Sequence, residues 1–188
     1  RYIEYLSNYE FGTDIKDAYF VDCGLTYSGT AATSISGLTH LEGEKIVVLG
    51  DGATHPDRTV SSGSITLARS VEKAHIGFNY KSTLQTMRID AGGTEGTSQG
   101  KNKRINNITL RLYRSVGVKV GSSEAELDLI PFRSSADDMS EALDMFTGDK
   151  EVEFRGGYDN DGFVFVRQDQ PLPLTVLAIF PRLQTFDQ

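Results

Sequence analysis

At 188 residues the chain is long enough for one large or two small domains, and it can bury a core without disulfides or metal. Hydrophobic residues make up 38% and charged residues 24%, which is typical of a folded globular protein and not of a disordered one. The net charge of −7, with no basic block, excludes a broad nucleic-acid-binding surface as the default interpretation. No apolar stretch approaches the ~20 residues that span a bilayer.

The chain begins without Met and alternates like a strand over residues 2–6, so we expect no signal peptide and a start within a longer protein. Residues 18–23 predict a second strand, and the Ser/Thr/Ala/Gly-rich segment 24–37 predicts a loop or a weak strand. Cys23 is the only cysteine, which excludes an internal disulfide and a Cys-based zinc site. We expect it to be a small buried apolar residue and not a nucleophile, because no activating base is near it in sequence.

Turn signals separate the next strands. The β-branched run at 44–49 is closed by Gly50-Asp51-Gly52, a strong strand-then-turn signal. The sequence Ser61-Ser62-Gly63 predicts the turn of a hairpin between the strand-like runs on either side of it. The strands predicted in this region are 44–49, 58–60, 64–67, 73–80 and 83–89.

The Gly/Ser/Thr/Asn-rich segment 91–103 predicts a long exposed loop, and we interpret Lys101, Lys103 and Arg104 as solvated charges of a turn. Residues 107–113 alternate cleanly, as expected for a strand with one wet face. Leu174 to Phe180 is nearly all apolar and predicts a central strand buried on both faces. Shorter strands are predicted at 118–120, as the return strand of 107–113, and at 151–154 and 162–168.

One segment, 135–146, could be a helix. Ser135 could cap it, and Met139, Leu143 and Phe146 fall at helical spacing. An irregular loop is the alternative, because short isolated helices need tertiary support, and both interpretations stay open.

The whole pattern predicts an all-β fold of antiparallel β-sandwich or barrel modules with at most one short helix. Composition changes near residues 24 and 80 predict a small β module at 24–80, inserted in a larger domain of residues 1–23 plus 81–188.

No local pattern supplies a catalytic site, since the serine elbow, the phosphate loop and the His-Glu-x-x-His zinc helix are all absent. We therefore predict no enzymatic activity, no catalytic or metal-binding residues and no cofactor. His40, His55 and His75 are spaced too irregularly for a local metal cluster, although they could converge in space. Asp159-Asn160-Asp161-Gly162 is as rich in oxygen as a calcium loop, but it lacks the Glu that completes an EF-hand, so we interpret it as a tight turn.

Paired carboxylates could serve a glycosidase-like mechanism, for example Asp51 with Asp57 or Asp137 with Asp138. That mechanism needs two carboxyl groups held across a groove, usually beside aromatic platforms for the sugar. The chain has no Trp, which disfavours a sugar-cleaving role.

Short segments along nearly the whole chain match, in order, a known family of large virion proteins. The most specific segment is 167–179, Arg-Gln-Asp-Gln-Pro-Leu-Pro-Leu-Thr-Val-Leu-Ala-Ile, and the others are 40–44, 50–57, 63–67, 100–105, 130–134 and 146–150. The chain thereby resembles the carboxyl-terminal part of the tail nozzle or tail tubular proteins of tailed bacteriophages and prophages. Residues 24–80 resemble the small β module called FCCH-like, after a domain of ubiquitin-activating enzymes, a label for a shape and not for ubiquitin chemistry.

The resemblance implies a non-enzymatic ring in the virion tail, assembled in the host cytoplasm, with other copies and neighbouring tail proteins as partners. DNA would pass through the ring passively, and the membrane would take no part. In the region matching 136–145 relatives often have Pro, whereas this chain has Ser-Glu-Ala-Leu, which favours a helix. A net negative wall would let DNA slide, because attraction to phosphates is the main source of non-specific binding.

Two alternatives to this role stay open. The first is a carbohydrate-binding or glycan-hydrolysing tail module that contacts the host surface, which clustered aromatic residues and paired acids in one groove would favour. The second is a cellular β-sandwich adhesion or binding domain.

Overall fold

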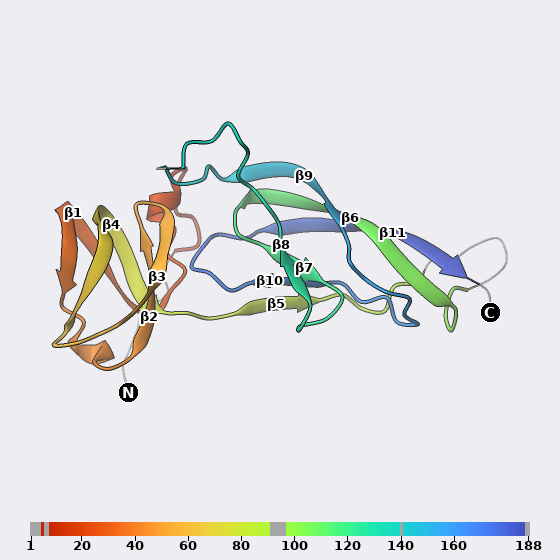
Figure 1. The fold of residues 1–188 in the computed structure, drawn as a ribbon, viewed down its shortest axis with the longest axis horizontal. Coiled ribbons are helices and arrows are strands. Elements are labelled where there is room, and N and C mark those ends of the chain that lie inside the picture. The colour runs from red at the N-terminus through yellow and green to blue at the C-terminus, as the bar shows by residue number, and fades with distance from the viewer. Residues whose placement is uncertain (1–4, 6–7, 91–96, 140, 187–188) are drawn as a thin grey trace. The chain divides into compact units, whose positions relative to one another are not determined.

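A computed structural model describes residues 5, 8–90, 97–139 and 141–186, and in this part of the chain it is an all-β protein (Figure 1). These residues form eleven strands and two 3₁₀ helices of three residues each. The strands make three sheets in which every pair is antiparallel, which confirms the predicted fold class. None of the described helices is long and apolar enough to cross a membrane.

The chain folds into two compact units. Unit 1 consists of residues 1–81, 133–145 and 169–173, and unit 2 of residues 82–132, 146–168 and 174–188. The boundary at 81 lies next to the predicted one at 80. Residues 1–23, which we expected with the larger domain, cluster instead with 24–81.

Unit 1 is built on one four-stranded sheet with the order β1-β4-β2-β3. Its β2–β3 hairpin closes through Asp51 and Gly52, whose φ angles of 48° and 80° are both positive, as a type I′ turn requires. The predicted strand and turn at 44–52 are thus confirmed. The strands of this sheet are β1 (Asp22–Ser36), β2 (Lys45–Gly50), β3 (Ala53–Thr59) and β4 (Ser64–Phe78).

Two predictions about unit 1 have different outcomes. The segment 24–37, expected to be a loop or weak strand, forms nearly all of β1, because its small polar residues face water while Ile35 faces the core. The prediction of a hairpin across residues 61–63 is wrong, because β3 pairs with β2 whereas β4 pairs with β1 and β2. Residues 61–64 do form a tight turn, in which the Ser61 N–H donates to the Ser64 carbonyl.

The segment before β1 packs on this sheet without joining it. Its 3₁₀ helix η1 (Ile15–Asp17) buries Ile15, and the Asp17 carboxylate lies 2.6 Å from the Lys73 ammonium of β4. Residues 18–21, predicted as strand, lie outside the strands, and β1 begins at Asp22. Of the predicted strand 2–6, residues 2–4 and 6 lie outside the described part, and Tyr5 is not in a strand.

The core of unit 1 lies on one face of the sheet and beneath the second 3₁₀ helix, η2 (Thr39–Leu41). Its buried residues are Ile35, Leu38, Leu41, Ile46, Val48, Val60, Ile65, Leu67, Val71, Ala74 and Ile76.

Unit 2 consists of two sheets that share one core, with the orders β11-β6-β9 and β5-β10-β7-β8. The predicted alternation over 107–113 is confirmed, because Ile108, Leu110 and Leu112 are fully buried while Arg111 and Tyr113 face water. Side chains from both sheets enter this core, so unit 2 is a β-sandwich. Its strands are β5 (Ser82–Gln85), β6 (Asn102–Ser115), β7 (Lys119–Gly121), β8 (Leu127–Leu129), β9 (Phe146–Glu153), β10 (Phe165–Gln168) and β11 (Val176–Phe186).

Other strands of unit 2 appear at changed bounds or with changed partners. The predicted return strand at 118–120 corresponds to β7, which pairs with β8 and β10 and not with β6. The predicted strands 83–89, 151–154 and 162–168 correspond to β5, β9 and β10.

The apolar run 174–180 does not form a central strand. It begins β11, which pairs only with β6 among the described strands and leaves Leu177 and Phe180 exposed by 59% and 46%. An apolar run indicates burial on both faces only where something covers the second face, and no described segment of unit 2 covers this one.

For the segment 135–146 both a helix and a loop had stayed open, and the structure shows a loop. Its described residues contain turns and no helix, residue 140 lies outside the described part, and Phe146 already belongs to β9. The Asp137 carboxylate accepts the Ser134 N–H, and the Arg133 guanidinium donates to the carbonyls of Asp138 and Glu141. These bonds satisfy polar groups that a helix would satisfy through its own backbone.

The predicted loop 91–103 is shorter than expected, since β6 begins at Asn102, and residues 91–96 lie outside the described part. Lys103 is not a solvated charge, because it is only 1% exposed. Its ammonium donates to the Asn160 carbonyl at 3.1 Å, and its backbone pairs with Asp159. The sequence around Lys103 resembles a loop, but the strand turns this side chain inward.

Carboxylates hold the turns of both units by accepting backbone N–H groups. Asp51, in the β2–β3 turn, accepts the N–H groups of Glu72 and Lys73 at 2.9 to 3.2 Å, where the pairing of β1 and β4 is irregular. Glu42 accepts the N–H groups of Ser62 and Gly63 at 2.8 and 2.6 Å. Each carboxylate satisfies donors that the sheet leaves without a backbone partner.

Replacing Asp51 with Ala is expected to lower the free energy of unfolding of unit 1 by about 1–2 kcal/mol, because it removes a charged acceptor from two backbone donors. Hydrogen exchange of the β2 and β4 amides measures the loss. Asp57→Ala is the control, since Asp57 makes an exposed ion pair with Lys45, and such pairs contribute about 0–1 kcal/mol. Equal effects of the two variants would contradict this role for Asp51.

The Asp90 carboxylate likewise accepts hydrogen bonds from residues 97–99, at the start of the described segment that follows residue 96. Hydrogen bonds from Ser98, Thr97 and Gln99 lower the pKa of Asp90 from 3.8 to about 2. The stabilisation by the Asp90 carboxylate is therefore complete above pH 3.8 and is lost as the pH falls through about 2.

We expect an NMR titration of the Asp90 carboxyl carbon to have its midpoint near pH 2, and Ser98→Ala to move the midpoint upward. A midpoint near 3.8 in the unaltered chain would show that these hydrogen bonds do not form in solution.

Candidate functional site

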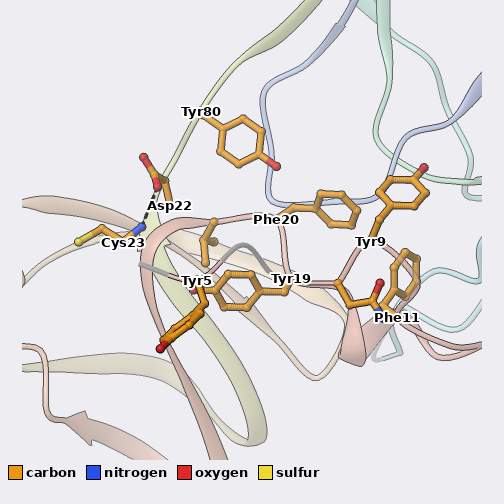
Figure 2. Close-up of a pocket in the computed structure, with 10 residues that line it drawn as sticks. Tyr5, Tyr9, Phe11, Tyr19, Phe20, Asp22, Cys23 and Tyr80 are labelled. Carbon is orange, nitrogen blue, oxygen red and sulfur yellow. Dashed lines mark hydrogen bonds between the residues drawn. The ribbon is translucent and has the colours of Figure 1, made fainter. Parts of the chain in front are cut away.

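Unit 1 contains a pocket that is lined mainly by aromatic side chains. It has a volume of about 400 Å³ and lies where the segment before β1 meets the start of β1 and the residues after β4 (Figure 2). We call it the aromatic pocket. It is lined by Tyr5, Asn8, Tyr9, Phe11, Tyr19, Phe20, Val21, Asp22, Cys23 and Tyr80.

Contacts between aromatic rings hold part of the wall of the aromatic pocket in place. Phe20 makes T-shaped contacts with Phe11 at 5.8 Å and with Tyr9 at 6.4 Å between ring centroids. Such edge-to-face pairs place the positive ring edge against the negative ring face, and each is worth about 0.5–1.5 kcal/mol beyond the burial of area. Tyr9 and Tyr80 remain 61% and 44% exposed, so their rings are accessible to a ligand.

The polar groups of the aromatic pocket include the carboxylate of Asp22 and the phenol of Tyr80. Asp22 Oδ1 accepts the Cys23 N–H at 3.0 Å, a contact drawn in Figure 2. Burial, with a smaller contribution from the negative charge of Asp22, raises the pKa of Tyr80 above its usual value of 10.0. This phenol is protonated at neutral pH and can donate a hydrogen bond. The lining contains neither Lys nor Arg, so its electrostatic character is neutral to negative.

Cys23 lies at the edge of the aromatic pocket with its sulfur directed away from the rings (Figure 2). It is half-buried and packs against the core of unit 1, in agreement with the expected role as a small apolar residue.

A second cavity, of about 190 Å³, lies in unit 2 beside the buried Lys103. Glycines at 156, 157 and 162 leave part of its wall without side chains, and Phe154, Tyr158 and Phe163 supply rings. The Lys103 ammonium donates to the Asn160 carbonyl, so it holds the turn at 159–162 closed.

The three histidines do not converge on a common site. His75 Nε2 lies 3.0 Å from the Lys16 carbonyl and therefore carries the proton, while Nδ1 accepts from the Thr26 hydroxyl at 2.9 Å. His55 Nε2 accepts from Arg69 Nε at 3.1 Å, and His40 Nε2 bonds the Cys23 carbonyl at 3.1 Å. Within the described ranges, no group of three His, Cys, Asp or Glu side chains could hold a metal ion.

The carboxylate pairs considered from the sequence have structural partners. Asp51 accepts backbone N–H groups of β4, whereas Asp57 pairs with the Lys45 ammonium at 3.0 Å. Asp137 accepts a backbone N–H from Ser134. These pairs therefore provide no groove with two free carboxyl groups.

Asp159-Asn160-Asp161-Gly162 forms the predicted turn. Gly162 has a φ of 64° and its N–H donates to Asp159 Oδ2, while Asp161 makes an ion pair with Arg88 at 2.7 Å. Hydrogen bonds and the Arg88 cation thus already engage both carboxylates of this loop.

Sequence analysis did not identify the aromatic pocket, because its residues come from three separate stretches. The available signal was the density of aromatic residues between Tyr5 and Phe20, where we had interpreted only 2–6 and 18–23, as strands. No protein-family model matches this sequence, and no curated protein matches it.

The buried histidines predict a pH dependence of unit 1. Burial is the main cause that lowers the pKa of His75 and of His55, which are 4% and 7% exposed. Each imidazole therefore stays neutral to a lower pH in the folded chain than in the unfolded chain. Unfolding takes up protons below pH 6.5, so the stability that these two residues contribute to unit 1 is complete above that pH and falls below it.

Between pH 6.5 and 5.5 the free energy of unfolding is expected to fall by up to about 1.4 kcal/mol per pH unit for each histidine. Urea unfolding at several pH values measures the slope. His75→Gln retains a donor and an acceptor but cannot titrate, and it is expected to remove roughly half of the slope. The same slope in a His55→Gln/His75→Gln double variant would contradict the assignment.

Proposed function

We propose that this chain is a non-catalytic structural component of a bacteriophage tail, acting through contacts with other copies and with neighbouring tail proteins. The resemblance of segments along nearly the whole chain to tail nozzle and tail tubular proteins motivates the proposal. The observation that carries it is the open edge of the β11-β6-β9 sheet.

That edge is the eleven-residue strand β11. Within the described part of the chain it pairs on one side only, and Leu177, Phe180 and Phe186 are 59%, 46% and 42% exposed. A long edge strand with exposed apolar side chains is a site of strand pairing unless another segment covers it. A neighbouring subunit would cover it in an assembled tail.

The two edges of this sheet differ in charge. On its water-facing side, the opposite edge strand β9 exposes Asp149, Glu151 and Glu153, whereas β11 exposes Phe180 and Arg182. An acidic edge and an apolar, basic edge are complementary in a head-to-tail contact, and such contacts generate rings when the rotation closes.

A chain of contacts joins the two edges. Arg111 of β6 donates two hydrogen bonds to the Asp149 carboxylate at 2.7 and 2.8 Å, and its guanidinium lies 5.1 Å from the centre of the Phe180 ring. Arg111 thereby fixes one residue of each edge strand, and we infer that it orders both edges for contact with neighbours.

The charge of the chain suits a conduit for DNA. With a net charge of −7 it repels phosphates on average, so DNA would pass without binding tightly. The proposed location is the virion tail, with assembly in the host cytoplasm.

The carbohydrate hypothesis has one observation in its favour, the aromatic pocket. Hydrolysis is not supported by it, because glycosidases need two carboxyl groups about 5–9.5 Å apart and Asp22 is the only acidic residue among those that line the pocket. Only sugar binding is considered further.

Sedimentation velocity between about 1 and 100 μM tests the assembly role. We expect the mass to increase with concentration, and Leu177→Glu/Phe180→Glu to abolish the increase, because two carboxylates on this edge would repel the acidic β9 edge of a neighbour. Tyr113→Glu is the control, since Tyr113 is 47% exposed on the central strand β6 of the same sheet.

A monomer at every concentration, or equal loss of association in the control, would contradict contact through the β11 edge. Detection of the chain in purified tails by mass spectrometry separately tests the phage origin, and its absence there would favour the cellular β-sandwich alternative.

A further inference from the structure

We propose that the aromatic pocket of unit 1 binds a neutral saccharide of one or two sugar residues. This inference does not rest on the assembly role, which concerns a strand edge in unit 2. It rests on the ring content, the polar groups and the charge of the pocket.

Six of the ten lining residues are aromatic. Figure 2 shows the rings of Tyr80 and Phe20 near one another, contributed by the residues after β4 and by the segment before β1, whereas the Tyr5 ring points away from them. The C–H groups on one face of a sugar ring carry partial positive charge and pack against the negative face of an aromatic ring. A wall of Tyr and Phe therefore suits a sugar ring without any Trp.

The polar groups can both donate and accept, as a sugar hydroxyl requires. The Tyr80 phenol donates, and Asp22 uses Oδ1 for the Cys23 N–H while Oδ2 accepts no hydrogen bond within the described part of the chain. Asn8 adds an amide, whose Oδ1 already accepts the Glu10 N–H and whose NH₂ group can donate to a ligand. Few polar groups in a largely aromatic cavity are typical of small-ligand sites.

The charge of the lining selects against other ligands. Without Lys or Arg it offers no partner for phosphate, sialic acid or a uronic acid, and Asp22 repels them. A quaternary ammonium needs several ring faces within about 6 Å of one point. Here the edge-to-face contacts of Phe11 and Tyr9 already engage Phe20, which leaves a platform and not a cage.

The size is consistent with this ligand class. The volume of about 400 Å³ falls at the lower end of the range of about 300–1,000 Å³ that small-molecule pockets span. A mono- or disaccharide fits such a cavity, and a longer chain would extend past the exposed Tyr5 and Tyr9.

The test is a titration of the 188-residue chain, followed by two-dimensional amide NMR, with maltose, cellobiose, lactose and N,N′-diacetylchitobiose. We expect saturable shifts with at least one of these sugars, at a Kd of about 0.1–10 mM, centred on residues that line the aromatic pocket. No saturable shift with any of the four would overturn the proposal, as would saturable binding of choline chloride with none of the sugars.

Two variants with a matched control locate the site. Tyr9→Ala removes an exposed ring and is expected to weaken binding about tenfold, and Tyr80→Phe removes one hydroxyl and is expected to weaken it about threefold. Tyr113→Ala, which removes a tyrosine that is 47% exposed from unit 2, is expected to leave the Kd unchanged.

The amide spectrum of each variant shows whether its fold is retained, and Tyr80→Phe preserves the ring if Tyr9→Ala disturbs Phe20. An unchanged Kd in Tyr80→Phe and in a folded Tyr9→Ala would overturn the assignment to this pocket. Leu177→Glu/Phe180→Glu is expected to bind the sugar normally, so failure of the assembly role and failure of sugar binding are distinguishable.

Discussion

The interaction on which both units depend is the hydrogen bond from a backbone N–H to a carboxylate at a turn. The sheets are irregular, with long strands, bulges and tight turns, and each irregularity leaves donors without a ladder partner. Asp51 and Glu42 satisfy such donors in unit 1, and Asp90 and Asp159 do so in unit 2. The acidic composition is thus partly a structural requirement, because a charged acceptor makes a stronger bond than a neutral one.

This use of carboxylates also explains why acid pairs in the sequence did not indicate a catalytic site. Asp51 and Asp137 accept backbone donors, and Asp57 and Asp161 pair with cations, so none of them stands in a groove as a free acid. Asp22 differs, since one of its oxygens accepts the Cys23 N–H while it lines a cavity. An acid engaged on one oxygen is suited to orient a polar ligand.

The sequence predicted local structure correctly where that structure depends on residues close together in the chain. The alternation of Ile108, Leu110 and Leu112 and the turn at Asp51 depend on neighbours in sequence, and both were predicted correctly. Strand partners, the edge position of 174–180 and the burial of Lys103 depend on residues far away in the chain, so composition misled there. The aromatic pocket was missed for the same reason, because Tyr80 joins rings that precede it by 60 residues or more.

The two units are interleaved along the chain, so recombination cannot easily exchange one of them alone. Unit 1 takes up 133–145 and 169–173 from within the part of the chain that otherwise builds unit 2, so the backbone passes between the units five times, after residues 81, 132, 145, 168 and 173. A recombination event with a single crossover, at whatever position, leaves at least one unit assembled from two parents. Natural exchange of either unit alone is therefore disfavoured, and related chains are expected to carry matched pairs of units that diverge together.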